Sequence, residues 1–182
     1  MIKNLNECAE DAVMHVADLM VAAAKTAPKG SGKDTVTALV LSGKDKDLLR
    51  DTMLEIGKET GEAFITRDAG NVDRSECVVA IGCINTPFGL DSCGMCGFKN
   101  CAEMKKAGAN CAFNITDLGI AIGSAVSVAE DHRIDNRVMY SAGRGAVRLK
   151  LLGDDVRVCY GIPLYTGSKS IFFDRGPGAV FF

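Results

Sequence analysis

The sequence has no tryptophan, and aromatic residues make up only 6% of its 182 positions. Its basic residues are spread along the chain, and the formal net charge at pH 7 is −2. Proteins that bind nucleic acid usually carry clustered basic residues and aromatic rings that stack on bases. We therefore expect no nucleic-acid partner.

Histidine is almost as scarce, because the chain holds only His15 and His132, which are far apart in sequence. No Ser–His–Asp pattern and no pair of carboxylates suited to acid–base catalysis can be identified. The sequence thus points to no catalytic side chain, and any reaction has to come from another kind of site.

Long apolar runs are missing as well. The longest, residues 118–129, has twelve residues, whereas a helix needs about 20 to cross a bilayer. Acidic residues stand near the amino terminus, where a signal peptide would have its apolar core. We expect a cytoplasmic protein with no membrane partner, in a compartment that keeps thiols reduced.

The length suits one domain with a full hydrophobic core. Apolar spacing predicts helices over residues 7–26, 45–61, 114–132 and 142–153. Short β-branched runs predict strands over residues 35–42, 77–82, 137–141 and 155–164. We expect a single domain over residues 1–182, in which a cysteine-rich insertion, residues 83–113, lies between a buried strand and the central helix.

Four of the eight cysteines fall in a short stretch, with the spacing C-x2-C-x4-C-x9-C formed by Cys93, Cys96, Cys101 and Cys111. In a reducing compartment, clustered cysteines indicate metal binding before disulfides. An iron–sulfur cluster needs about four thiolates on one inorganic core, and close spacing keeps the entropy cost of bringing them together low. Gly94 and Gly97 follow the first two cysteines, where the chain has to turn tightly. We predict a [4Fe–4S] cluster on these four residues.

Two other interpretations remain open. A structural zinc site usually has two C-x2-C pairs, and this stretch has one. Cys83, ten residues before Cys93, is the substitute ligand if Cys111 does not serve. The remaining cysteines, Cys8, Cys77 and Cys159, lie in a predicted helix and two predicted strands and read as structural.

The stretch "CGMCGFKNCAEMKKAG" resembles the small four-cysteine cluster domain of corrinoid iron–sulfur proteins and of some membrane electron-transport complexes. These share the opening C-G-x-C-G-[FY]-x-x-C. Their last gap is usually longer than the nine residues found here, which makes Cys111 the ligand most in need of a test.

The rest of the chain is similar to nitroreductases, from the A-x-x-A-P loop near residue 27 to the closing segment "VRVCYGIPLYTGSKSIFFDR". Combined with the cysteines, the segments "DLGIAIGSA", "DNRVMY" and "GIPL…FFDR" resemble the uncharacterised prokaryotic ferredoxin-domain family. The resemblance implies an α+β fold with a central, mainly antiparallel sheet flanked by helices. It also implies a homodimer, and for nitroreductases an FMN at the subunit interface.

The chain departs from nitroreductases at the positions that hold FMN. Their arginine-rich phosphate motif is absent, and Gly30, Ser31 and Gly32 replace the Asn and Gln after the A-P loop. A flavin would have to use other residues. The resemblance suggests contacts from the loop after residue 27 and from basic residues that replace the lost arginines: Lys29, Gly30, Ser31, Lys169 and Arg175.

Two functions of different kinds follow. The first is a redox protein that carries one [4Fe–4S] cluster and transfers electrons to or from a partner protein, a flavin or a small molecule. The second is a non-catalytic structural or interaction protein, whose four-cysteine site binds zinc or a purely structural cluster. The substrate, the electron donor and the electron acceptor are not encoded in any pattern that we recognise.

Overall fold

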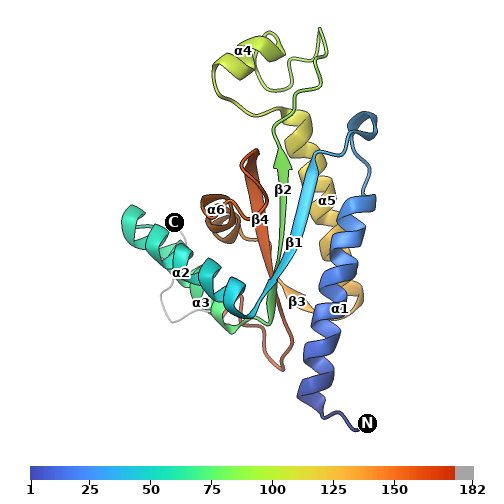
Figure 1. Cartoon of the computed structure of the whole chain (residues 1–182), viewed down its shortest axis with the longest axis vertical. Helices are drawn as coiled ribbons and strands as arrows, with labels where there is room; N and C mark the ends of the chain where they lie inside the picture. Colours follow the sequence, from blue (N-terminus) through green and yellow to red (C-terminus); the bar gives the residue numbers. More distant parts are fainter. Residues whose placement is uncertain (175–182) are drawn as a thin grey trace.

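The computed structural model describes residues 1–174 (Figure 1). Four strands and six α-helices, with one short 3-10 turn (η1, Gly30–Gly32), make up this part of the chain. The strands are β1 (Val36–Ser42), β2 (Cys77–Ile84), β3 (Asp135–Asn136) and β4 (Val156–Tyr165). The helices are α1 (Leu5–Thr26), α2 (Gly43–Thr60), α3 (Ala63–Arg74), α4 (Cys101–Lys106), α5 (Ala112–Asp131) and α6 (Tyr140–Arg148).

The strands form one sheet in the order β1-β2-β4-β3, and every neighbouring pair is antiparallel. Val36 lies opposite Cys83 and Ser42 lies opposite Cys77, so β1 and β2 run side by side over their whole length. The expected α+β fold with an antiparallel sheet between helices is confirmed.

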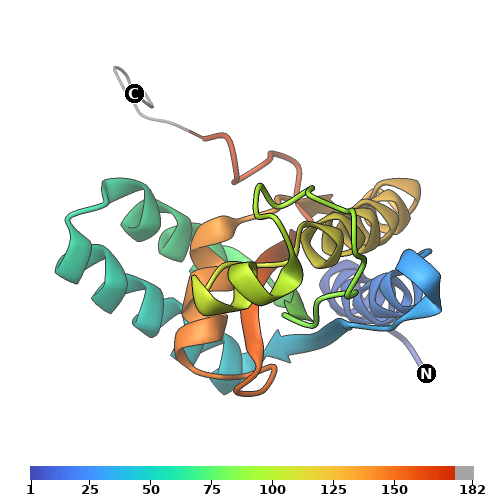
Figure 2. The same ribbon diagram turned by 90° about the horizontal axis from the view of Figure 1, so that it is seen from above.

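Strand β2 is buried on both of its faces. Cys77, Val79, Ile81 and Cys83 pack into a core formed with α1 and α5. The alternating residues Val78 and Ala80 pack into a second core, formed with α2, α3 and α6. Figure 2 shows the two helical layers on opposite sides of the sheet. Burial on both faces explains why this strand reads as an unbroken apolar run.

Four elements differ from the sequence-based prediction. The helix expected over residues 142–153 is α6, which ends at Arg148. Helix α3 was not predicted, because its buried face includes the polar residues Asp68 and Asn71 and so weakens the apolar periodicity. Helix α5 begins two residues before Asn114, with Cys111 as its N-cap. The strand expected over residues 137–141 is reduced to β3 and a single bridge between Met139 and Gly161, because α6 already begins at Tyr140.

Within residues 1–174, helix α5 is long and apolar enough to span a membrane by length and composition alone. In this fold it packs on one face of the sheet beside α1, and Leu118, Ala121 and Ala125 belong to the shared core. A core helix passes the same test, so the composition of α5 is explained by its place in the fold.

Helix α6 lies unusually close to β4. A Cβ atom placed on Gly143 would come within 1.8 Å of the carbonyl oxygen of Cys159. On the strand side, a Cβ on Gly161 would lie 2.6 Å from the Cβ of Ala142. Both positions therefore require glycine, and their two missing side chains set the distance between the helix and the sheet.

We expect Gly143→Ala to lower the free energy of unfolding by about 2 kcal/mol or more, because the new methyl group meets rigid backbone. Chemical denaturation monitored by circular dichroism measures the change. Gly70→Ala is the matched control, since a Cβ there meets nothing within 4 Å and the backbone is helical. The control should be stabilised by about 0.5–1 kcal/mol. Equal stability of the two variants would contradict the close approach.

Candidate metal centre

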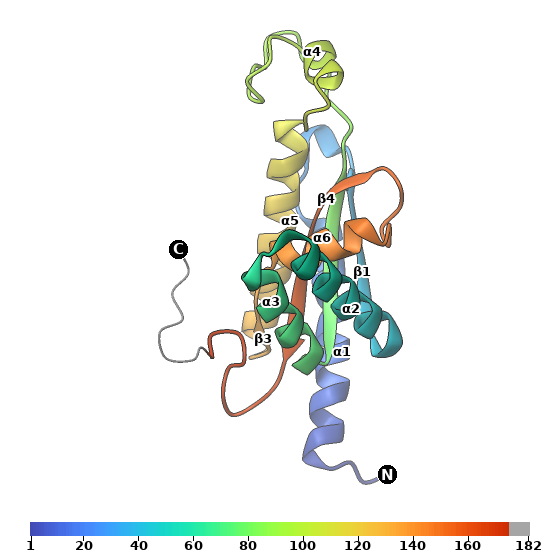
Figure 3. The same ribbon diagram turned by 90° about the vertical axis from the view of Figure 1, so that its left-hand side faces the viewer.

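Residues 85–111, here called the projecting segment, connect β2 to α5 and extend beyond the end of the sheet (Figures 1 and 3). The segment holds one short helix, α4, and otherwise consists of turns. Met104 on α4 is the one side chain of the projecting segment that is fully buried. A segment of this size cannot build a large core of its own. Its packing therefore depends on whatever occupies its interior.

The four clustered cysteines line one cavity in this segment. Cys93, Cys96, Cys101 and Cys111 share it with apolar side chains, and the cavity encloses about 370 Å³ of empty space, part of which is open to solvent. The apolar lining consists mainly of Phe88, Leu90, Phe98, Met104 and Phe113. Cys111 is buried, whereas Cys93, Cys96 and Cys101 are partly exposed. The structure thus brings together thiols that lie up to eighteen positions apart.

Two of these cysteines stand where helices begin. Cys111 is the N-cap of α5, and Cys101 is the first residue of α4. Asn100 caps α4, because its side-chain oxygen accepts a hydrogen bond from the Glu103 N–H at 2.9 Å. The two helices therefore fix where these cysteines stand.

Glycine shapes the turn that carries the other two cysteines. Gly94 has φ +62° and Gly97 has φ +81°, and each directly follows a cysteine. The Gly97 N–H donates to the Gly94 carbonyl at 2.9 Å, which closes a tight turn. Left-handed backbone of this kind favours glycine. The turn explains the C-G-x-C-G pattern seen in the sequence.

Side chains of the main fold hold the base of the projecting segment. Asn85 donates to the Ala109 carbonyl and accepts from the Cys111 N–H, both at 3.0 Å. Arg157, on β4, donates to the Gly108 carbonyl at 2.7 Å. Asn114 accepts from the Thr86 N–H at 2.9 Å. The sequence does not single out Asn85, Arg157 or Asn114 for these contacts, because nothing in their local sequence indicates these distant partners.

The four thiols are the donor type of both zinc sites and iron–sulfur clusters. Among residues 1–174, no three His, Cys, Asp or Glu side chains are already arranged to hold one metal ion. Either group would therefore require the thiols around the cavity to move closer to it, and metal analysis distinguishes the two.

The other buried cysteines lie in the main fold. Burial raises the pKa of Cys77 and of Cys159 to about 12, and that of Cys83 to about 11. These three therefore stay protonated and inert at neutral pH. Cys83 packs in the core formed with α1 and α5 and does not line the cavity. Cys8 is exposed on α1.

The loop residues predicted to contact FMN are engaged in the main fold. The Lys29 ammonium donates to the carbonyls of Ala24, Lys25 and Ala27, and so caps the carboxyl end of α1. The Gly30 N–H donates to the Asp117 carboxylate of α5 at 3.1 Å. A Cβ on Gly30 would lie 2.8 Å from the Phe88 ring. This turn, with Ser31 at φ +53°, packs against the central helix rather than facing an open cleft.

The predicted basic residue Lys169 lies at the opposite end of the sheet. It follows β4 and pairs with Asp174 at 2.9 Å. The strand register places the 30–32 turn near Cys83 and Lys169 near Cys77, and β2 is about 25 Å long. Arg175 lies outside the described residues. One chain therefore does not assemble the predicted flavin residues into one site.

Known structures with this architecture are nitroreductases. A protein of Desulfovibrio desulfuricans, described as a nitroreductase in complex with FMN, matches at a TM-score of 0.55 and 12% identity, over 86% of this chain and 80% of that one. Nitroreductase A of Vibrio parahaemolyticus matches at 0.55 and 10%, over 85% and 58%. At such low identity the likeness shows the fold. The class is thus a protein of nitroreductase-like fold.

The particular family follows from sequence. The family model "Uncharacterized protein containing a ferredoxin domain (DUF2148)" matches residues 107–175. An "Uncharacterized protein" of Archaeoglobus fulgidus is 37% identical over 185 residues, which cover 97% of this chain and 99% of that protein. The chain belongs to this ferredoxin-domain family. The matched range includes Cys111 but not Cys93, Cys96 or Cys101, so the complete ligand set remains our prediction.

We expect Cys93→Ser, Cys96→Ser, Cys101→Ser and Cys111→Ser each to reduce the iron content of anaerobically purified protein several-fold, because each removes one ligand from the cavity. Colorimetric iron and sulfide assays measure the loss. Cys83→Ser is the matched control and should retain its iron. If Cys83→Ser loses iron while Cys111→Ser keeps it, the fourth ligand is wrongly assigned.

Proposed function

We propose that this protein is a cytoplasmic redox protein that carries one [4Fe–4S] cluster on Cys93, Cys96, Cys101 and Cys111 and transfers single electrons. The observation that carries the proposal is the shared cavity, in which four thiols from one short segment face a common space. Membership of a ferredoxin-domain family supports a redox role. The fold adds further support, because proteins that share it include oxidoreductases containing FMN.

The residues around the cavity suit such a group. When bound, a [4Fe–4S] cluster gains or loses one electron without making or breaking a substrate bond. Phe88, Phe98 and Phe113 exclude water from the buried side of the thiols. Hydrogen bonding, solvent exposure and net charge around the sulfurs tune the potential of such clusters. The partial positive charge at the start of α5 would offset the negative charge of a bound cluster. The partial exposure of Cys93 and Cys96 would give electrons a short path to a partner.

A structural role is the alternative, and the small core of the projecting segment favours it. A metal held by four thiolates would fold this segment whether or not it exchanged electrons, as structural metals do in other small modules. Zinc would then serve as well as iron. The two functions differ in metal content and in redox response, so one preparation can distinguish them.

FMN is the second candidate cofactor, and its support is the fold alone. The Gly30 amide is bound to Asp117, and Lys29 is bound to helix carbonyls. Lys169 stands at the other end of the sheet. Of the predicted residues in and beside the 30–32 turn, Lys29 and Gly30 are bound within the fold, whereas Ser31 is exposed. We propose the cluster as the principal redox centre of the chain.

Anaerobic purification followed by iron, sulfide, zinc and flavin analysis tests these assignments together. We expect a brown protein with about four iron atoms and four sulfides per chain, little zinc, and visible absorbance that dithionite bleaches. A colourless protein with one zinc per chain would refute the redox role and support the structural one. Flavin that co-purifies in a one-to-one ratio would show that a site exists outside the predicted residues.

We also propose a symmetric homodimer, in which the outer face of α5 packs against its counterpart. Gly119 and Gly123 lie on this face, and a Cβ at either position would meet nothing within 4 Å. Ile120 beside them is 41% exposed. Small residues four apart on a helix allow another helix to approach closely. The apolar carboxyl-terminal sequence "AVFF" also favours an interface by its composition, and it lies outside the described residues.

Light scattering of the native protein should give the mass of a dimer at micromolar concentration. Gly123→Glu should shift it to the monomer without loss of helical signal, because the single chain has room for the side chain and only a partner would meet it. Gly70→Glu, on exposed α3 backbone, is the control and should remain a dimer. A monomeric native protein would refute this assembly.

A further inference from the structure

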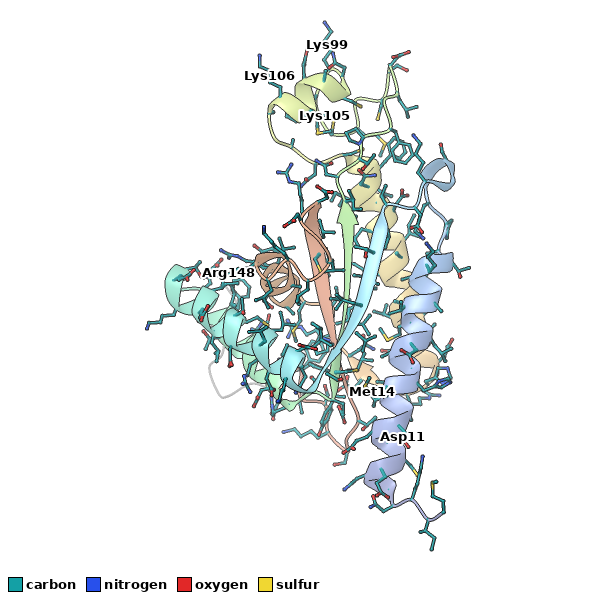
Figure 4. The ribbon with its side chains drawn as sticks, viewed as in Figure 1. Asp11, Met14, Lys99, Lys105, Lys106 and Arg148 are labelled. Carbon is teal, nitrogen blue, oxygen red and sulfur yellow. The ribbon has the colours of Figure 1, made fainter. Side chains whose placement is uncertain are left out.

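The outer surface of the projecting segment carries a group of unpaired lysines. Lys99, Lys105 and Lys106 extend from the end of the molecule, around α4 (Figure 4). All three are exposed, and none forms an ion pair within residues 1–174. Against them the segment has two acidic residues, Asp91 and Glu103, which gives it a net charge of +1. The whole chain has −2, so the three lysines form a local positive rim on an acidic protein. A bound cluster with its four thiolates would add negative charge beneath this rim.

Apolar side chains lie within the same surface. Met95, between the first two cysteines in sequence, is 57% exposed, and Leu90, which lines the cysteine cavity, is 49% exposed. Leu90 thus lies beside the cysteines, and Met95 belongs to the same segment as the lysines. Helix α4 carries Cys101 together with Lys105 and Lys106, so these positive charges lie close to one of the thiols.

We propose that this surface docks an acidic one-electron carrier protein, one with carboxylates around its own redox centre. The inference rests on the proposed function, because it assigns the partner of the same cluster. Protein complexes that transfer electrons are typically small and short-lived. Complementary charge steers such partners together and fixes their orientation more than it adds to affinity. A carrier seated here would come as close to the thiols as the fold permits.

The electron balance of the encounter is simple. A reduced carrier loses one electron, and the oxidised cluster gains it, with no proton transfer and no bond made or broken. The reverse step regenerates the starting states. The lysines act on the approach and orientation of the carrier and do not take part in the transfer itself.

Other classes of macromolecule fit the surface less well. Three lysines are few for nucleic acid, and Phe88, Phe98 and Phe113 face the cavity instead of forming a platform for bases. An anionic membrane would be attracted by the same lysines, but the surface offers only two exposed apolar side chains to a bilayer. The experiment below therefore also measures binding to membrane vesicles.

The probe for the test is an acidic flavodoxin, titrated anaerobically into the iron-loaded protein by calorimetry. Binding should be measurable at low ionic strength and weaken at least about tenfold at about 0.5 M salt. Lys105→Glu combined with Lys106→Glu should weaken it at least about tenfold. The milder pair Lys105→Gln and Lys106→Gln should weaken it by less, in the same direction. Stopped-flow mixing with reduced flavodoxin should show a matching loss in the rate of cluster reduction.

Lys44→Glu is the matched control. Lys44 is also exposed, but it lies at the start of α2, at the opposite end of the sheet. Its substitution should change flavodoxin binding less than about twofold. Cytochrome c, a basic carrier, should not bind the native protein. An equal effect of the control and the charge-reversed pair would show that net charge, and not this surface, is responsible, and would overturn the proposal.

The iron and sulfide content of every variant shows whether a failed test concerns the docking surface or the cluster itself. If the native protein holds its cluster but does not bind flavodoxin, the docking surface is refuted and the proposed function stands. If the native protein holds no cluster, the proposed function is refuted whatever binds. Binding to vesicles rich in phosphatidylserine, without binding to flavodoxin, would assign the lysines to a membrane and also overturn the docking proposal.

Discussion

The structure depends on one strand that is buried on both faces. Strand β2 pairs with β1 on one side and β4 on the other, and its side chains alternate between two separate cores. Every residue of such a strand has to be apolar or very small, and the pairing leaves its backbone no unsatisfied group. This rigidity fixes where the strand ends. The chain that leaves it at Ile84 therefore starts the projecting segment from a well-defined point.

The cysteine cavity combines that fixed base with a flexible interior. Cys111 and Cys101 are placed by helices, whereas Cys93 and Cys96 are placed by a glycine turn. Thiols on regular elements have restricted positions, and thiols on a turn can adjust. Such a division is well suited to receiving an inorganic core, whose geometry the protein has to match. The buried cysteines of the sheet, by contrast, have a pKa raised by burial, and they lie away from the cavity.

Most of the fold and part of the candidate site could be predicted from local sequence. The strands β1, β2 and β4 and the helices α1, α2 and α5 follow from apolar periodicity, because each buries a regular face. Helix α3 could not be predicted in this way, because its buried face includes the polar residue Asp68. That carboxylate accepts a hydrogen bond from the hydroxyl of Ser141, which lies 73 positions away on α6. The surroundings of the predicted flavin residues could not be foreseen for the same kind of reason. Which group Gly30 binds, and at which end of the sheet Lys169 lies, are properties of the tertiary structure that no neighbouring residue reveals.

Part of the attachment of the projecting segment uses its own main chain, whereas its Phe88 side chain contacts the Phe113 ring and Lys33. Asn85 and Arg157 reach the carbonyls of Ala109 and Gly108, and the Cys111 amide returns a hydrogen bond to Asn85. Main-chain groups are the same in every sequence, so these attachments do not constrain the side chains between them. The interior of the segment is therefore free to diverge while its base stays fixed. A different short metal-binding loop could therefore replace this segment, in evolution or in the laboratory, without redesign of the sheet.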